Sequence, residues 1–109
     1  MSNAIKLDDL PWTPVRPEIA TGISGKTMLD TATKMVYTRV EAGGGFAPHV
    51  DGYDHLMYIL NGRGVAVAGG IEYRLEPGLM LEIEAGEEHC YRNTGSDLLE
   101  LLSLNVPAR

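Results

Sequence analysis

The three histidines of the chain lie near the ends of predicted strands, and an aspartate accompanies one of them. His49 and His55 occur in the segment PHVDGYDHLMYILNG, and His89 occurs in EAGEEHCYRN. Asp51 follows His49 by two residues, so both side chains would project from the same face of an extended strand. Imidazole and carboxylate groups are suitable ligands for divalent Fe, Mn, Ni, Zn or Cu. The spacing therefore predicts a site for one divalent transition metal per chain.

Glycine and proline divide the sequence into apolar runs of about four to eight residues, the pattern of an all-β barrel or sandwich. Asn61-Gly62 and Gly69-Gly70 are strong signals for hairpin turns, so we expect mainly antiparallel hairpin connections. A tight reversal at residues 52–54 would bring His55 onto the strand next to that of His49. The predicted strands, enough to close a barrel, cover residues 27–29, 34–41, 55–60, 64–68, 71–75, 79–83, 89–92 and 98–104.

The two ends of the sequence suggest how the barrel is covered. Residues 1–26 are expected to form an extended arm without a helix, because three prolines interrupt it, and to pack on a single barrel domain at residues 27–109. Leucine occupies both faces of the last predicted strand, which favours burial on both sides. We therefore expect a homodimer that uses this strand and the arm. These leucines are Leu98, Leu99, Leu101, Leu102 and Leu104.

Composition restricts the class of partner. The chain has 109 residues, the size of one domain, and a formal net charge of −6 with its basic residues spread singly, which argues against nucleic acid and anionic membranes. Small molecules and metals remain as expected partners. No stretch approaches the roughly 20 apolar residues of a membrane span, and residues 1–10 lack a secretory signal, so we expect a cytoplasmic protein. Cys90 has no disulfide partner and should point away from the metal, because it alternates with His89.

Two stretches of the sequence resemble the sequence motifs of the cupins. The first motif reads Gly, five residues, His, one residue, His, three or four residues, Glu, six residues, Gly. The second reads Gly, five residues, Pro, one residue, Gly, two residues, His, three residues, Asn. This sequence keeps the spacings with Gly43, His49, Asp51, His55 and Gly62, and then with Gly78, Glu84, Gly86, His89 and Asn93. The resemblance covers residues 43–93 and implies an all-β, double-stranded β-helix (jelly-roll) barrel that holds a metal in its mouth.

Three positions depart from the cupin motifs. Asp51 replaces the second histidine, His55 replaces the glutamate, and Glu84 replaces the proline. Three imidazoles and one carboxylate remain, so the resemblance implies a metal bound by His49, Asp51, His55 and His89. Because aspartate reaches less far than histidine, a second variant has three histidine ligands, with Asp51 as a base that orients bound water or substrate. Either variant leaves coordination positions open, as a catalytic metal requires.

The resemblance leaves the reaction open, because cupins include many enzymes as well as storage and sugar-binding proteins. The first hypothesis is a small-molecule metalloenzyme of dioxygenase-like type. The second is a non-redox isomerase or lyase for a sugar or sugar acid, in which Asp51 or Tyr91 moves protons. The third is a non-catalytic module that binds a ligand or stores the metal. Besides Tyr91, the candidates for lining the pocket are Tyr53, Asp54, Tyr58 and Glu100.

Overall fold

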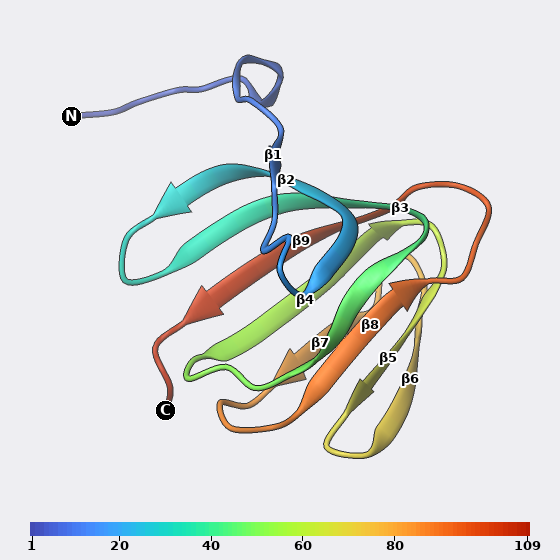
Figure 1. Ribbon diagram of the computed structural model, residues 1–109. Helices are drawn as coiled ribbons and strands as arrows, with labels where there is room; N and C mark the ends of the chain where they lie inside the picture. The colour runs from blue at the N-terminus through green and yellow to red at the C-terminus, as the bar shows by residue number, and fades with distance from the viewer.

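Nine antiparallel strands form one strongly curled sheet in the computed structural model, which describes all residues 1–109 (Figure 1). Neighbours in the sheet follow the order β6-β5-β8-β3-β9-β4-β7, while β2 pairs with β3 and β1 pairs with β2. The predicted all-β jelly-roll fold is confirmed. The strands are β1 (Thr13–Pro14), β2 (Ala20–Asp30), β3 (Lys34–His49), β4 (Asp54–Asn61), β5 (Gly64–Ala68), β6 (Ile71–Leu75), β7 (Met80–Ile83), β8 (His89–Asn93) and β9 (Leu99–Val106).

Most connections cross the barrel, so the prediction of mainly hairpin connections is wrong. Only β1–β2, β2–β3 and β5–β6 are consecutive strands that pair, and Gly69-Gly70 forms the turn of the last pair. After Asn61 the chain crosses over, because both edges of β4 are already occupied by β9 and β7. Gly62 has a φ of +92°, and a Cβ there would lie 2.5 Å from the carbonyl oxygen of Leu98. This glycine therefore permits a close crossing at the start of β9 rather than a hairpin.

The strands β2 and β3 are longer than the sequence predicted. β2 begins at Ala20, and β3 continues beyond Glu41 to His49. Glycines conceal both extensions because they interrupt the apolar alternation of a strand. At Gly25, for example, an added Cβ would lie 2.5 Å from the Val36 side chain, so the missing side chain allows β2 to lie close to β3.

The N-terminal arm crosses from the outer surface of the sheet to the mouth of the barrel (Figure 1). It contains one short 3-10 turn, η1 (Leu7–Asp9), where the prolines had predicted no helix. Trp12 packs on the outer face, with the Arg39 guanidinium 3.9 Å from its ring centroid and the Tyr37 ring edge-on at 5.6 Å. No helix in the structure is long and apolar enough to span a membrane.

Inward-facing side chains change from apolar to polar towards the open end of the barrel. Paired residues of β3, β9 and β4 share one face of the sheet, and they form successive rows across it. Met57, Ile59 and Leu101 are fully buried at the apolar end of these rows. The row at the polar end, which contains His55, therefore lies where the cupin resemblance places a metal site. The three rows are Thr38, Leu101 and Ile59; Val36, Ser103 and Met57; and Lys34, Asn105 and His55.

The leucines of β9 divide between the two faces of the sheet, as the sequence predicted. Leu99 and Leu101 face inwards and are fully buried. Leu102 and Leu104 alternate with them, face outwards and are half-buried. Because β9 lies between β3 and β4, its backbone is paired on both edges. The outward leucines therefore belong to an apolar outer surface, and the edges of β9 are not available to another chain.

Candidate metal centre

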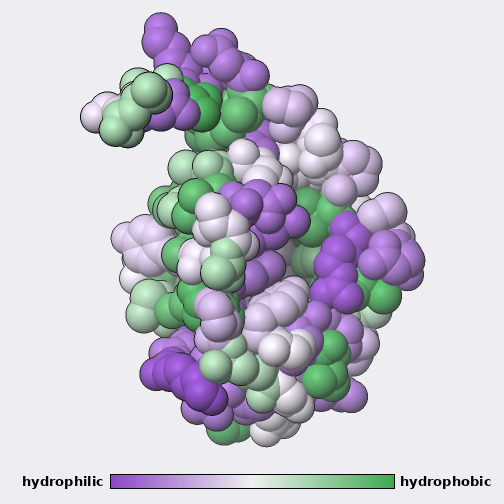
Figure 2. Space-filling model, turned by 90° about the vertical axis from the view of Figure 1, so that its left-hand side faces the viewer, coloured by the Kyte–Doolittle hydropathy of each residue, from purple (hydrophilic) through white to green (hydrophobic).

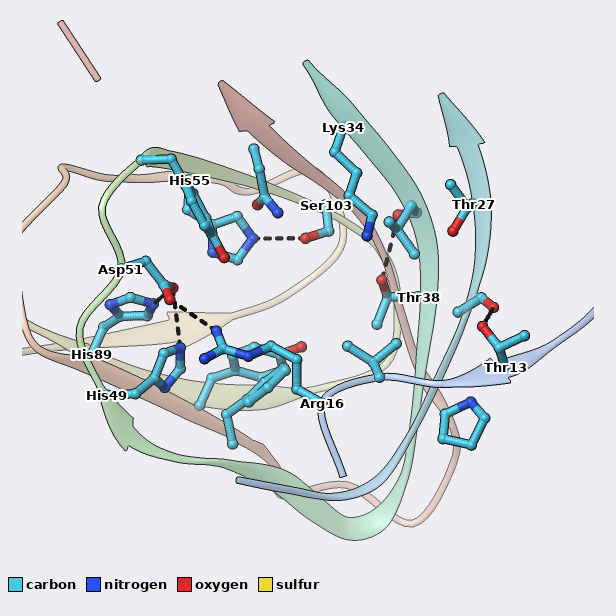
Figure 3. A pocket seen from close by; sticks show the side chains of 18 residues that line it. Thr13, Arg16, Thr27, Lys34, Thr38, His49, Asp51, His55, His89 and Ser103 are labelled. Atoms are coloured by element: carbon cyan, nitrogen blue, oxygen red, sulfur yellow. Dashed lines mark hydrogen bonds and ion pairs between the residues drawn. The ribbon is translucent and has the colours of Figure 1, made fainter. Parts of the chain in front are cut away.

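Two histidines and one aspartate converge at the mouth of the barrel (Figure 3). His49 ends β3, and His89 begins β8, where the two residues are directly paired. Asp51 follows in the loop between β3 and β4, and its backbone carbonyl accepts a hydrogen bond from Gly86. The Asp51 Oδ2 atom lies 3.3 Å from Nε2 of His49 and 3.3 Å from Nε2 of His89. Strand pairing and loop anchoring thus place three of the predicted ligands together.

Backbone hydrogen bonds fix which nitrogen each histidine presents to the centre. Nδ1 of His49 lies 2.7 Å from the carbonyl oxygen of Ala47, and Nδ1 of His89 lies 2.9 Å from that of Glu87. Since a carbonyl only accepts, each Nδ1 carries a hydrogen and donates it. In the neutral form of each ring, the lone pair of Nε2 is therefore directed at Asp51, which is itself an acceptor. In this form three acceptors face one another, an arrangement that a cation between them would stabilise.

The spacing of these acceptors suits a divalent metal. Ligand atoms about 2.1 Å from an ion lie about 3.0 Å apart at a right angle and about 3.4 Å apart at the tetrahedral angle. The two contacts of 3.3 Å fall within this range. Nε2 of His89 is also buried without a hydrogen-bond partner in the chain, and a bound cation would satisfy this nitrogen. The residues present therefore fit a bound metal.

His55 lies beside this group but is not one of the three convergent residues. Its ring centroid is 6.1 Å from that of His89, and its Nε2 is 2.7 Å from the hydroxyl oxygen of Ser103. When Nε2 donates to Ser103, Nδ1 holds the lone pair, and this atom is buried without a partner. The expected tight reversal does not make β4 a neighbour of β3, because β9 lies between them. Nδ1 of His55 is thus the atom that this residue can offer as a ligand beside the three convergent residues.

The buried His55 predicts a loss of stability in mild acid. Burial, aided by the neighbouring His89, lowers its pKa from the ordinary 6.5 to about 4, despite the opposing charge of Asp51. Between these values the unfolded chain takes up a proton that the folded chain resists, so stability falls as the pH falls from 6.5 towards 4. We expect a loss of about 3 kcal/mol in urea unfolding of chelator-treated protein. His55→Gln should remove that part of the pH dependence; an unchanged slope in this variant would contradict the assignment.

Arg16, on the arm, completes the surroundings of Asp51. Its Nη1 donates a hydrogen bond of 2.8 Å to Asp51 Oδ1, while Oδ2 faces the two histidines. Burial raises the pKa of Asp51, but the Arg16 hydrogen bond and the charges of His49, Arg16 and His89 outweigh it, so the pKa is lowered overall. Arg16 also has a φ of 39°, a strained backbone conformation for a residue with a side chain. The aspartate can therefore bind a cation through one oxygen and remain oriented through the other.

A cavity of about 360 Å³ opens beside these residues, and Figure 2 shows hydrophilic side chains within the hollow on this face. Of the pocket candidates, Tyr53 and Tyr91 line it. Burial raises the pKa of Tyr91, so its phenol stays protonated near neutral pH. The other three candidates do not line the cavity. Asp54 accepts a hydrogen bond from Ala85, Tyr58 is exposed, and Glu100 accepts one from Tyr37.

Three residues near the centre were not singled out from the sequence. Arg16, Lys34 and Ser103 all line the cavity. Each is a single polar residue in a segment that reads as arm or strand, with no motif around it. Only the pairing of strands and the path of the arm bring them to the histidines. Cys90, in contrast, is absent from the cavity lining, as its alternation with His89 predicted.

The comparisons with known proteins agree with this architecture. A family model described as Cupin domain matches residues 36–105, and a search of curated proteins finds no match. The polyketide cyclase RemF from Streptomyces resistomycificus is 21% identical with a TM-score of 0.85, over 96% of this chain and 79% of its own. A predicted oxalate decarboxylase from Thermotoga maritima is 20% identical (TM-score 0.86; 96% and 99% covered), and KdgF from Halomonas sp. is 24% identical (0.80; 94% and 92%). These likenesses show the fold, and the family match shows that the chain belongs to the cupin-domain family.

Proposed function

We propose that the protein is a metal-dependent enzyme for a small organic molecule bound in the barrel. The observation that carries this proposal is the convergence of His49 Nε2, His89 Nε2 and Asp51 Oδ2, three acceptors without a donor between them. In the proposed site these atoms bind one divalent metal. His55 is a fourth ligand through Nδ1, or it faces the substrate. Arg16 holds the carboxylate of Asp51 in place.

The ligand set supports a dioxygenase-like reaction. Two histidines and one carboxylate with open positions are the donor set of non-haem Fe(II) oxygenases. Such an iron supplies the activation of oxygen when it is bound. The chain's own contribution is to fix the ligands: Ala47 and Glu87 orient the two imidazoles, and Arg16 orients Asp51. The adjoining cavity, near the lower end of the roughly 300–1,000 Å³ of small-molecule sites, holds the substrate beside them.

A non-redox isomerase or lyase is the second candidate, and Tyr91 is the observation that favours it. The Tyr91 side chain is 4% exposed, lines the cavity, and has a raised pKa because it is buried. A phenol that stays protonated at neutral pH can donate a proton to a substrate oxygen. Asp51 has a lowered pKa and is the matching base only if its Oδ2 is not taken by the metal.

Elemental analysis of untagged protein purified without chelators tests the metal site. We expect about one transition-metal ion per chain in the wild type. The element found chooses between the two reactions: iron with oxygen uptake on adding small diketones or catechols supports the dioxygenase, whereas zinc or nickel without uptake supports the non-redox enzyme. Bound metal without turnover of any compound would favour a binding module. A wild-type chain that holds no metal, even after reconstitution, would refute the proposal.

We also propose that the outer face of the sheet forms a homodimer interface. Tyr37, Leu102, Tyr58 and Met80 form one outward row across four strands, and the last two are 41% and 58% exposed. An apolar row of this kind is typical of a surface that another chain covers. Sedimentation should give twice the 11.8 kDa chain mass. Tyr58→Glu should shift the protein to monomer, while Glu72→Gln should not; a monomeric wild type would contradict the interface.

A further inference from the structure

We propose that the cavity binds a small organic acid and that Lys34 holds a carboxylate of this acid at the end remote from the metal ligands. The inference rests on the proposed function, because it takes the metal centre as the other end of the same ligand site. Neither the cupin motifs nor the convergent metal ligands include Lys34. It is the position of this side chain in the sheet that points to the role.

The register of the sheet places Lys34 on the interior face. Lys34 pairs with Asn105, and Asn105 pairs with His55, so the three residues form one row across β3, β9 and β4. Paired residues share a face, and His55 faces the cavity. Two steps between strands separate the Cα atoms of Lys34 and His55 by about 10 Å. A ligand with a few carbon atoms can therefore reach from the metal centre to the Lys34 ammonium group.

The Lys34 ammonium group is not engaged within the chain. It makes no ion pair or hydrogen bond, and Asp30, its pairing partner across the β2–β3 turn, does not bridge to it. Figure 3 shows the side chain extending into the cavity on the side of Thr38 and Ser103, across the view from Arg16. Lys34 is exposed, and its ammonium group has three donors and no acceptor, so an anion that enters the cavity can bind it in place of water. The surrounding hydroxyl and amide groups, from Thr13, Thr27, Thr38, Ser103 and Asn105, suit the polar atoms of such a ligand.

The charge of the cavity is opposite to that of the whole chain. The chain has a formal net charge of −6. Around the cavity, Arg16 and Lys34 contribute two positive charges and Asp51 contributes one negative charge, and a divalent metal adds two more positive charges. Anions are thus repelled by the surface at large and attracted to this one opening. Glu18, 3.6 Å from Arg16 Nε, is an exposed acidic neighbour of that guanidinium and does not line the cavity.

A carboxylate suits this end of the cavity better than a phosphate does. Phosphate groups are typically held by several donors together, such as the backbone N–H groups at the start of a helix or paired arginines. The only helical segment here is the short turn η1, outside the cavity. One free ammonium group with neutral hydroxyls around it matches the single charge of a carboxylate. The cavity of about 360 Å³ restricts the acid to a small one.

Calorimetric titration of zinc-loaded protein with diacids and their monoamides tests the proposal. The probes are malonate, succinate and glutarate, each paired with the amide that removes one charge. For at least one length we expect the diacid to bind about 10-fold more tightly than its monoamide, as a hydrogen bond between charged groups implies. Lys34→Gln should abolish that preference and leave the monoamide affinity and the zinc content unchanged. Lys34→Arg should restore part of it.

Lys6→Gln is the matched control, because it removes the same charge from the exposed arm outside the cavity. It should keep the preference for the diacid. If Lys34→Gln keeps the preference at every length, or if no diacid is preferred by the wild type, the proposal is overturned while zinc binding leaves the proposed function intact. If the wild type binds no zinc, the proposed function is refuted and the two-ended acid site is refuted with it. Equal thermal midpoints of the variants exclude misfolding as the cause.

Discussion

His89→Ala is expected to lower the affinity for a divalent metal by roughly 100-fold or more. Loss of an outer-shell partner alone costs roughly 10- to 100-fold, and His89 offers a ligand atom itself. The variant also leaves Asp51 facing only one imidazole, so the remaining donors no longer enclose an ion. Competition with a chromogenic chelator measures the affinity, and elemental analysis of the purified variant should find little bound metal.

Cys90→Ala is the control for His89→Ala, because Cys90 lies in the same strand and points away from the cavity. Its metal affinity should match the wild type. Asp51→Ala then distinguishes the two proposed arrangements of the site. If metal affinity falls as far as in His89→Ala, Asp51 is a direct ligand. If metal occupancy stays near normal, Asp51 is a base beside the metal. Metal that survives the combined loss of His49 and His89 would show that the site is elsewhere.

Gly45→Ala is expected to destabilise the fold by roughly 3 kcal/mol, a large share of the roughly 5–15 kcal/mol that stabilise a domain. Gly45 pairs with Arg92 where β3 meets β8. An added Cβ would collide with the carbonyl oxygen of Tyr91 and lie 2.8 Å from Cα of Arg92. Because these are backbone atoms, β3 and β8 would have to separate, and that pairing also joins His49 to His89. Urea unfolding should show the lower stability, and chelator competition should show weaker metal binding.

Gly52→Ala is the matched control for Gly45→Ala. It makes the same substitution one residue after Asp51, but no atom lies within 4 Å of the added Cβ, and the backbone is not in the left-handed region. Its stability should stay within about 0.5 kcal/mol of the wild type. If Gly45→Ala is equally neutral, the close approach of β3 and β8 does not determine stability or hold the two histidines together.

The sequence predicted the members of the candidate metal site better than their surroundings. His49, Asp51 and His89 could be found because their residue types and spacings follow from local strand geometry and from the cupin motifs. Arg16 and Lys34 could not, because their contacts depend on long-range pairing of segments that carry no local signal. Whether His55 binds the metal stays a prediction, since its Nε2 is bonded to Ser103 and only Nδ1 remains.

Strand positions could be predicted more accurately than their connections. β5 and β6 have the predicted bounds, because alternation and a Gly-Gly turn are local features. The turn at Asn61-Gly62 has the same local chemistry as a hairpin, yet the chain crosses over there. What decides between the two is competition for the edges of β4, which a local pattern does not contain. Residues with alternating apolar character thus define strands, and the packing of the whole sheet defines their neighbours.

The pairing of His49 with His89 also determines when in folding a metal can bind. The two residues are far apart in the chain, and they meet only after β8 has docked on β3. The unfolded chain therefore has no preformed site, and non-local pairing of this kind makes folding slow. Because the proposed ion would bind only the assembled sheet, it should retard unfolding while leaving the refolding rate nearly unchanged. In a cell, metal supply would then set the lifetime of the folded protein rather than the speed of its formation.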